Sequence, residues 1–198
     1  MADIDEVVGG AIEQAGESRL NSFIALFVAI AATLMALDNI KDGNVGQAMA
    51  QAQSRGVDAW SYYQAKSTKE ALAEATVETL QGMRTTLPPG APGIADLDKR
   101  IVSYQAQVAR YDKEKADIKT QAEGFQAEYD RLNLHDDQFD LSDAGFSVSI
   151  ALFGVTALTR KRWLLGVAAV FLLVGLVFGA AGFFEWSLHP DRFMSWLS

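Results

Sequence analysis

The residues best suited to chemistry are one imidazole and several carboxylates that lie close together in the chain. His135, Asp136 and Asp137 are consecutive, and Asp140 and Asp143 follow within about two helical turns. Hard divalent cations prefer such oxygen-rich ligand sets. The spacing matches no established metal motif, however, and acids are also favourable near the start of a helix, where the dipole is positive. We therefore predict no metal ion, with His135, Asp136, Asp137 and Asp140 as the weak candidates.

Other signatures of catalysis are missing from the sequence. It has no GxGxxG, Walker, HExxH or GxSxG element, no cysteine and only 2 histidines. A chain without cysteine can form neither a disulfide framework nor a thiolate metal site. The net charge of -8 leaves no basic face for a phosphate backbone, so nucleic acid is excluded as a partner. We predict a protein that is not an enzyme and binds no cofactor.

The apolar residues are concentrated in three runs, and this pattern predicts an integral membrane protein. The runs cover residues 20–37, 145–159 and 163–184, and the second can be extended back to residue 141. Each is close to the roughly 20 residues that a helix needs to cross a bilayer. The fold class that we expect is an all-α membrane protein with three transmembrane helices.

Residues 38–144 are expected to form a long antiparallel coiled-coil hairpin outside the membrane, with its turn at the proline-rich residues 87–93. Apolar residues spaced three and four apart favour two helices that face each other along a seam. Counting from the turn brings Glu70 and Lys115 close together, which predicts a polar layer that sets the register; a ligand site or ion relay is the alternative. The predicted seam consists of Val45, Met49, Ala52, Gly56, Ala59, Tyr63, Lys66, Glu70, Ala73, Val77 and Leu80 on the first arm, and Ile94, Leu97, Ile101, Tyr104, Val108, Tyr111, Lys115, Ile118, Ala122, Phe125, Tyr129 and Leu132 on the second.

Small residues recur along all three apolar runs, and such stripes let helices approach closely in lipid. Aromatic side chains on the hairpin suit packing between its arms or between subunits; a peptide-binding or glycan-binding patch is the alternative. The residues that we expect in helix packing or oligomer contacts are Trp60, Tyr63, Ser67, Tyr104, Tyr111, Phe125, Tyr129, Ala25, Ala29, Gly175 and Gly179. The stripes themselves are Ser22, Ala25, Ala29, Ala32 and Ala36, then Ala144, Ser147, Ala151 and Gly154, then Gly175, Gly179 and Gly182.

The basic residues between the second and third runs predict the orientation of the chain. Arg160, Lys161 and Arg162 form a short loop that favours the cytoplasmic side. The N-terminus is then cytoplasmic, and the hairpin and the C-terminus lie on the other side. Residues 1–19 read as an acidic amphipathic helix, and residues 185–198 as an interfacial aromatic tail with a short helix opening at Pro190. Trp163, Trp186 and Trp196 are the expected interface anchors.

Three segments carry a resemblance to a known family. Residues 60–67 (WSYYQAKS), 139–141 (FDL) and 159–163 (TRKRW) resemble the bacterial membrane-protein family catalogued as domain of unknown function 4337. The resemblance implies one membrane helix, an extended helical segment and a terminal membrane hairpin, in a bacterial inner membrane with the extended segment in the periplasm. It implies no activity.

These observations lead to one functional hypothesis and two alternatives. We expect a homo-oligomeric inner-membrane scaffold or interaction protein, because a two-helix rod has too little interior to cover its own aromatic rings. Its expected partners are membrane lipid and further copies of the chain, with another envelope protein as a further candidate. The first alternative is an oligomeric channel or small-solute conduit. The second is a metal-dependent envelope enzyme that uses His135 and its neighbouring acids.

Overall fold

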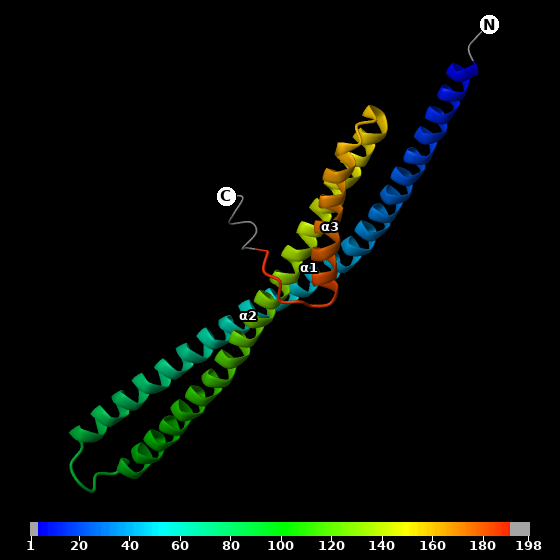
Figure 1. Ribbon diagram of the computed structural model, residues 1–198. Coiled ribbons are helices and arrows are strands. Elements are labelled where there is room, and N and C mark those ends of the chain that lie inside the picture. Colours follow the sequence, from blue (N-terminus) through cyan, green and yellow to red (C-terminus); the bar gives the residue numbers. More distant parts are fainter. Residues whose placement is uncertain (1–3, 191–198) are drawn as a thin grey trace. The chain divides into compact units, whose positions relative to one another are not determined.

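The computed structural model describes the backbone of residues 4–190 and the side chains of residues 19–190. Over the described backbone the chain is entirely helical and contains no strand, so the all-α prediction is confirmed. The helices are α1 (Ile4–Thr86), α2 (Ile94–Thr159) and α3 (Trp163–Phe183), as Figure 1 shows.

Proline explains why α1 ends where it does and a separate helix, α2, follows. The four prolines of the chain are Pro88, Pro89, Pro92 and Pro190, so neither α1 nor α2 contains one. Proline removes a backbone donor and clashes with the preceding turn of a helix. Between α1 and α2 the chain reverses, with the Ala91 amide donating to the Pro88 carbonyl at 3.1 Å and with Gly90 and Gly93 at φ values of 83° and 93°. These left-handed backbone conformations favour glycine.

The changes of composition along the chain do not mark helix ends. The predicted N-terminal helix, first span and first hairpin arm all belong to the single helix α1, and the second arm and second span belong to α2. The side chains of residues 1–18 lie outside the described ones, so the acidic face predicted there cannot be placed. Helical hydrogen bonds thus continue across polar and apolar sequence alike within α1 and within α2.

Residues 49–130 form one compact unit, which we call the hairpin. Its two arms pack against each other antiparallel, so the prediction that two long helices pack together is confirmed. Every predicted seam residue from Met49 to Tyr129 is buried or half-buried. Among the seam residues, Ala52, Ala73, Ile101, Ile118 and Ala122 are at most 9% exposed.

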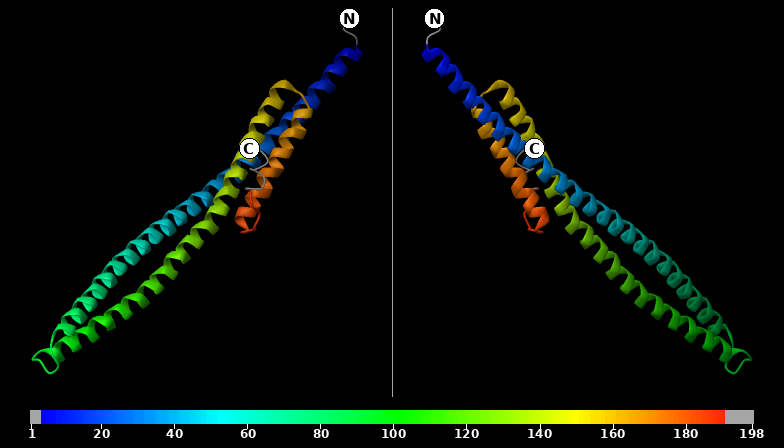
Figure 2. Two further views of the ribbon diagram at one scale, coloured as in Figure 1. Left: turned by 90° about the vertical axis from the view of Figure 1, so that its left-hand side faces the viewer. Right: turned by 90° about the vertical axis from the view of Figure 1, so that its right-hand side faces the viewer.

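Residues 1–48 and 131–198 form the second compact unit, which we call the bundle. Its helices are the first part of α1, the last part of α2, and α3, which lie side by side in both views of Figure 2. The bundle therefore takes in residues 38–48 and 131–144, which composition alone assigns to the hairpin. A hydrophobic core joins its three helices, made of Ile24, Ala31, Phe146, Phe153, Ala168 and Leu172.

The structure contains three helices long and apolar enough to cross a membrane, judged by length and composition. Their apolar segments carry large side chains that point away from the bundle core. Phe23, Leu26 and Ile30 of α1 are 62%, 55% and 44% exposed, and Val170 and Leu173 of α3 are both 59% exposed. The apolar segments thus present large apolar side chains on the outer surface of the bundle as well as in its core.

Candidate functional site

A crossed pair of salt bridges joins the two arms of the hairpin. Lys115 of α2 pairs with Glu70 of α1, so the polar layer predicted from the sequence is confirmed. One turn away along α1, Lys66 pairs with Glu114, which directly precedes Lys115 on α2. Each arm thus supplies one lysine and one glutamate. Glu114 lies beside the seam, and for that reason the heptad pattern did not identify it.

Tyrosine rings surround the two lysines. The Lys66 ammonium lies 5.1 Å from the ring centroid of Tyr62 and 5.4 Å from that of Tyr111, and Lys115 lies 5.9 Å from the Tyr63 ring. A cation over an aromatic face is attracted by the ring quadrupole. The hydrogen bond to Glu114 raises the pKa of Lys66, so this lysine stays charged at neutral pH. The layer favours one alignment of the two arms, because sliding either arm would separate both ion pairs at once.

A shallow groove of about 260 Å³ lies on the hairpin, where the seam residues are small. Trp60 is 41% exposed at its edge, and its ring meets Tyr63 edge-on at 5.6 Å between centroids. Of the other predicted contact residues, Ser67, Tyr104 and Tyr111 are half-buried along the hairpin. The groove is lined by Ala52, Gln53, Gly56, Val57, Trp60, Ala122, Phe125, Gln126 and Tyr129.

The glycines of α3 pack within the bundle. A side chain at Gly145 of α2 would lie 2.7 Å from the Gly175 backbone nitrogen, and one at Gly179 would lie 2.7 Å from a carboxylate oxygen of Asp38. Gly175 and Gly179 thus serve contacts inside one chain. The stripes that include Ala25 and Ala29 on α1, and Ala144, Ser147, Ala151 and Gly154 on α2, are exposed instead.

The small-residue stripe of α2 does not form the face that packs within the chain. The buried face is formed by two series at seven-residue spacing. One series is apolar, and the other carries polar side chains at most 6% exposed. Because α3 and α1 both pack on α2, large and polar residues of α2 lie between the helices. The series are Leu132, Phe139, Phe146 and Phe153, and His135, Ser142, Ser149 and Thr156.

Carboxylates of α1 and α2 face each other at one end of the bundle. Asp42 lies near Asp136, Asp140 and Asp143, and one oxygen of its carboxyl group is buried without a hydrogen-bond partner. Burial, followed by the charges of Asp136 and Asp140, raises the pKa of Asp42 to about 6. Burial also raises the pKa of Asp136. Like charges in a desolvated place favour a shared proton.

The weak metal candidates do not converge on one point. Within the described residues, no group of three or more histidine, aspartate or glutamate side chains is arranged to hold a metal ion. His135 is only 6% exposed, and its Nδ1 lies 3.1 Å from Oε1 of Gln138. Asp136 faces Asp42, whereas Asp140 is exposed.

Gln138 anchors the segment that follows α3. Its fully buried side-chain amide donates to the carbonyl oxygens of Trp186 at 2.8 Å and Leu188 at 2.7 Å. Because both amide hydrogens are used, Oε1 is the acceptor, and the nearby His135 Nδ1 carries a hydrogen. The Trp186 side chain is 52% exposed, whereas Pro190 is buried. Residues 185–189 form no helix, and the predicted anchor Trp196 lies outside the described residues.

The basic loop connects α2 to α3. Arg160, Lys161 and Arg162 are exposed, as is Trp163. Arg160 adopts a left-handed φ of 56° directly after α2 ends. No side chain caps the start of α3, and its first turn contains no acid. The three cations follow the negative end of α2 and precede the positive end of α3, so their effects on the two helix dipoles oppose each other.

The class of protein that these observations define is an all-helical protein made of a hairpin and a three-helix bundle, with three helices apolar enough to cross a membrane. A family model described as Domain of unknown function (DUF4337) matches residues 20–185, and the chain belongs to this family. No curated protein and no solved structure matches the chain significantly.

Several residues that shape the bundle were not singled out for their contacts. Asp38 is 4% exposed and hydrogen-bonds to Ser142, and Gln138 is fully buried. The seven-residue recurrence from His135 through Ser142 and Ser149 to Thr156 was the signal in the sequence that could have identified the buried polar face of α2. Polar residues at this spacing mark an interior face when a third helix covers them.

Proposed function

We propose that the protein is an integral membrane scaffold of the bacterial inner membrane, with a structural rather than a catalytic role. The observation that carries this proposal is the apolar outer surface of the bundle. Side chains such as Phe23, Leu26 and Leu173 are more than half exposed. Contiguous apolar patches of this kind are unfavourable in water, whereas contact with lipid tails is favourable.

Extraction tests this proposal directly. We expect the full-length protein to remain in the pellet when membranes are washed with alkaline carbonate, and to enter solution only with detergent. A peripheral protein held by charge would be released by the wash. Recovery of the chain in the aqueous fraction would contradict the proposal.

The orientation that we propose has the basic loop in the cytoplasm and the hairpin in the periplasm. The loop places three cations in a short connection between two apolar helices, and this pattern favours the cytoplasmic side. The hairpin arms are rich in charged and polar residues on their outer faces, as an aqueous location requires.

We further propose that copies of the chain associate through the exposed small-residue stripes of the bundle. Ser147 of the α2 stripe lies 3.9 Å from the Met35 sulfur, and Met35 is next to Ala36 of the α1 stripe. This contact places part of the α2 stripe beside α1. Small residues that face away from their own bundle permit another helix to approach closely. On the hairpin, the partly exposed Trp60 at the groove suits a contact with a second copy or an envelope protein.

Single cysteines test this association cleanly, because the natural chain has none. We expect Ala29→Cys to form disulfide-linked dimers in membranes under mild oxidation. The matched control is Leu173→Cys, which is 59% exposed but lies on α3, outside the stripes. Equal crosslinking of the two variants, or none with Ala29→Cys, would contradict the proposed interface.

A further inference from the structure

Three buried oxygen atoms from three different helices lie in hydrogen-bond contact inside the bundle. The Ser142 hydroxyl of α2 contacts a carboxylate oxygen of Asp38 on α1 and lies 2.8 Å from the Gly175 carbonyl oxygen of α3. Asp38 is 4% exposed, and Ser142 is fully buried. The contacts thus form a continuous chain from α1 through α2 to α3.

Counting hydrogens shows that this chain needs one more proton than ionised side chains provide. A serine hydroxyl carries a single hydrogen, and a backbone carbonyl oxygen carries none. If Asp38 were ionised, Ser142 could donate to Asp38 or to Gly175, and the other contact would bring two acceptors together. Both contacts are satisfied when the Asp38 carboxyl group carries a proton and donates to Ser142, which then donates to Gly175.

The surroundings of Asp38 favour its neutral form. A side chain at Gly179 would lie 2.7 Å from Oδ2 of Asp38, so the carboxyl group packs directly on the backbone of α3. The charge that acts on it is that of Asp143 from α2. Along α1, Lys41 lies three residues and Asp42 four residues from Asp38. On α3, Gly175 lies against Ser142 and Gly179 against Asp38, and Glu185 beyond the helix pairs with Arg131 at 3.4 Å. Within the described residues no lysine or arginine forms an ion pair with Asp38.

We propose that Asp38 is a proton-binding site, and that its proton joins α1, α2 and α3 through Ser142 and Gly175. The ligand is the proton itself, so this inference goes beyond the scaffold role and does not depend on association between copies. Loss of the proton turns the Ser142 hydroxyl towards the carboxylate and leaves the Gly175 oxygen facing an acceptor. Deprotonation therefore weakens the attachment of α3 to the other two helices, and α3 packing and proton binding are thermodynamically linked.

Infrared spectroscopy of the full-length protein in detergent measures the protonated carboxyl group directly. We expect its carbonyl stretching band at neutral pH. The band should be lost in Asp38→Asn, displaced in Ser142→Ala because a hydrogen-bond partner is removed, and unchanged in the exposed control Asp117→Asn. Subtracting the Asp38→Asn spectrum isolates this residue from Asp42 and Asp136. Identical spectra of the wild type and Asp38→Asn would overturn the proposal.

Thermal unfolding provides a second readout. The amide of Asp38→Asn still donates to Ser142, so its Tm should equal or exceed that of the wild type at alkaline pH, where the wild type has lost the proton. Asp38→Ala cannot donate and should have a lower Tm across the pH range. A Tm of Asp38→Asn that equals that of Asp38→Ala at every pH would contradict the role of the donated hydrogen. If Asp38→Asn does not fold, the proposal requires the displaced band of Ser142→Ala, and an undisplaced band overturns it.

Discussion

Asp42 shows how a single residue makes the bundle sensitive to pH. Its carboxyl group is partly buried among Asp136, Asp140 and Asp143, and one of its oxygens has no partner. The folded chain therefore binds a proton at Asp42 more tightly than the unfolded chain does. The resulting stabilisation is fully present below the ordinary pKa of 3.8 and is lost as pH rises through about 6.

We expect Asp42→Asn to remove this part of the pH dependence. Above pH 6 the variant should be more stable than the wild type by about 1–2 kcal/mol, after allowance for solvent screening. Denaturant unfolding in detergent, measured from pH 4 to about pH 8, checks this. Asp117→Asn on an exposed face is the control. An unchanged slope in Asp42→Asn would show that its carboxyl group is not held protonated.

Glycine contacts provide a second test at this scale. A methyl group at Gly145 would lie 2.7 Å from the Gly175 nitrogen and 2.9 Å from its Cα, and backbone atoms cannot turn aside. Gly145→Ala should destabilise the bundle by about 1–3 kcal/mol. Gly166 on α3, outside the small-residue stripes, has nothing within 4 Å of the added methyl group, so Gly166→Ala should be neutral or slightly stabilising. Equal unfolding midpoints would contradict the close approach of α2 and α3.

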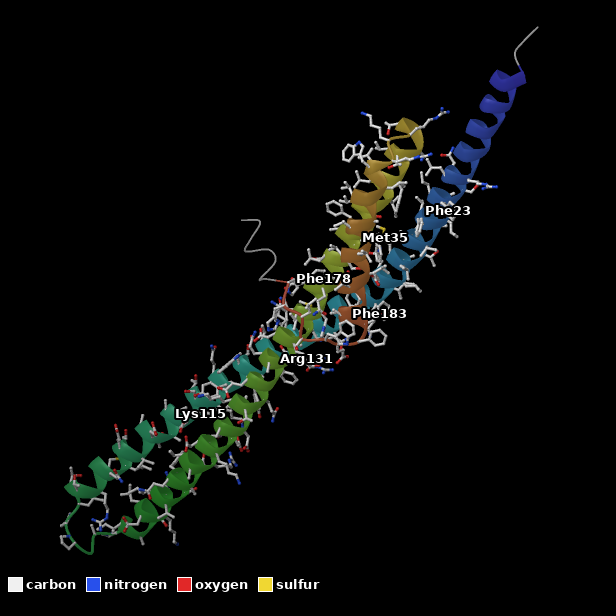
Figure 3. All side chains as sticks on the ribbon, viewed as in Figure 1. Phe23, Met35, Lys115, Arg131, Phe178 and Phe183 are labelled. Carbon is white, nitrogen blue, oxygen red and sulfur yellow. The ribbon has the colours of Figure 1, made fainter. Side chains whose placement is uncertain are left out.

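At the scale of the helices, the hairpin register follows from the turn and the crossed salt bridges. Counting outward from residues 87–93 predicted the contact between Glu70 and Lys115, because two helices of equal rise stay aligned over several turns. The heptad seam could also be predicted from the sequence, because a repeat of 3.5 residues keeps the same residues facing the partner helix. Lys115 is labelled in Figure 3. Glu114 was not predicted, since it reaches Lys66 from beside the seam.

A disulfide across the arms tests this register. A Cβ atom at Gly56 would lie 3.7 Å from that of Phe125, close to the mean of about 3.8 Å in disulfides. We expect the double variant Gly56→Cys, Phe125→Cys to form an intramolecular disulfide that changes gel mobility until it is reduced. Gly124→Cys in place of Phe125→Cys is the control, because Gly124 is exposed and adjacent in sequence. A disulfide only in the control would place the arms in another register.

Sequence reasoning was less successful for the bundle. Periodicity shows which residues of α2 share a face, but α1, α3 and the segment after α3 all pack on α2, and periodicity does not show which of them covers which face. The partners of Asp38 and Gln138 depend on that arrangement, and neither residue occupies a repeating apolar position. Small-residue stripes were read as packing faces, yet those of α1 and α2 are exposed in the single chain. Met35 and Phe178, both labelled in Figure 3, belong to the bundle surfaces that pack instead.

For the whole molecule, we propose that the hairpin and the bundle have different roles. The hairpin has a polar layer that sets its register and a groove beside Trp60, whereas the bundle has an apolar exterior and a buried carboxyl group. The three apolar segments all belong to the bundle, as a membrane domain requires. On this account lipid surrounds the bundle, and the hairpin lies in water on the non-cytoplasmic side.

Labelling of single cysteines with a membrane-impermeant maleimide tests this account most directly. In intact bacterial spheroplasts we expect Gly90→Cys, at the exposed hairpin turn, to react at once. Lys161→Cys, in the exposed basic loop, should react only after the membrane is permeabilised. Reaction of both cysteines before permeabilisation, or of Lys161→Cys alone, would contradict the proposed topology.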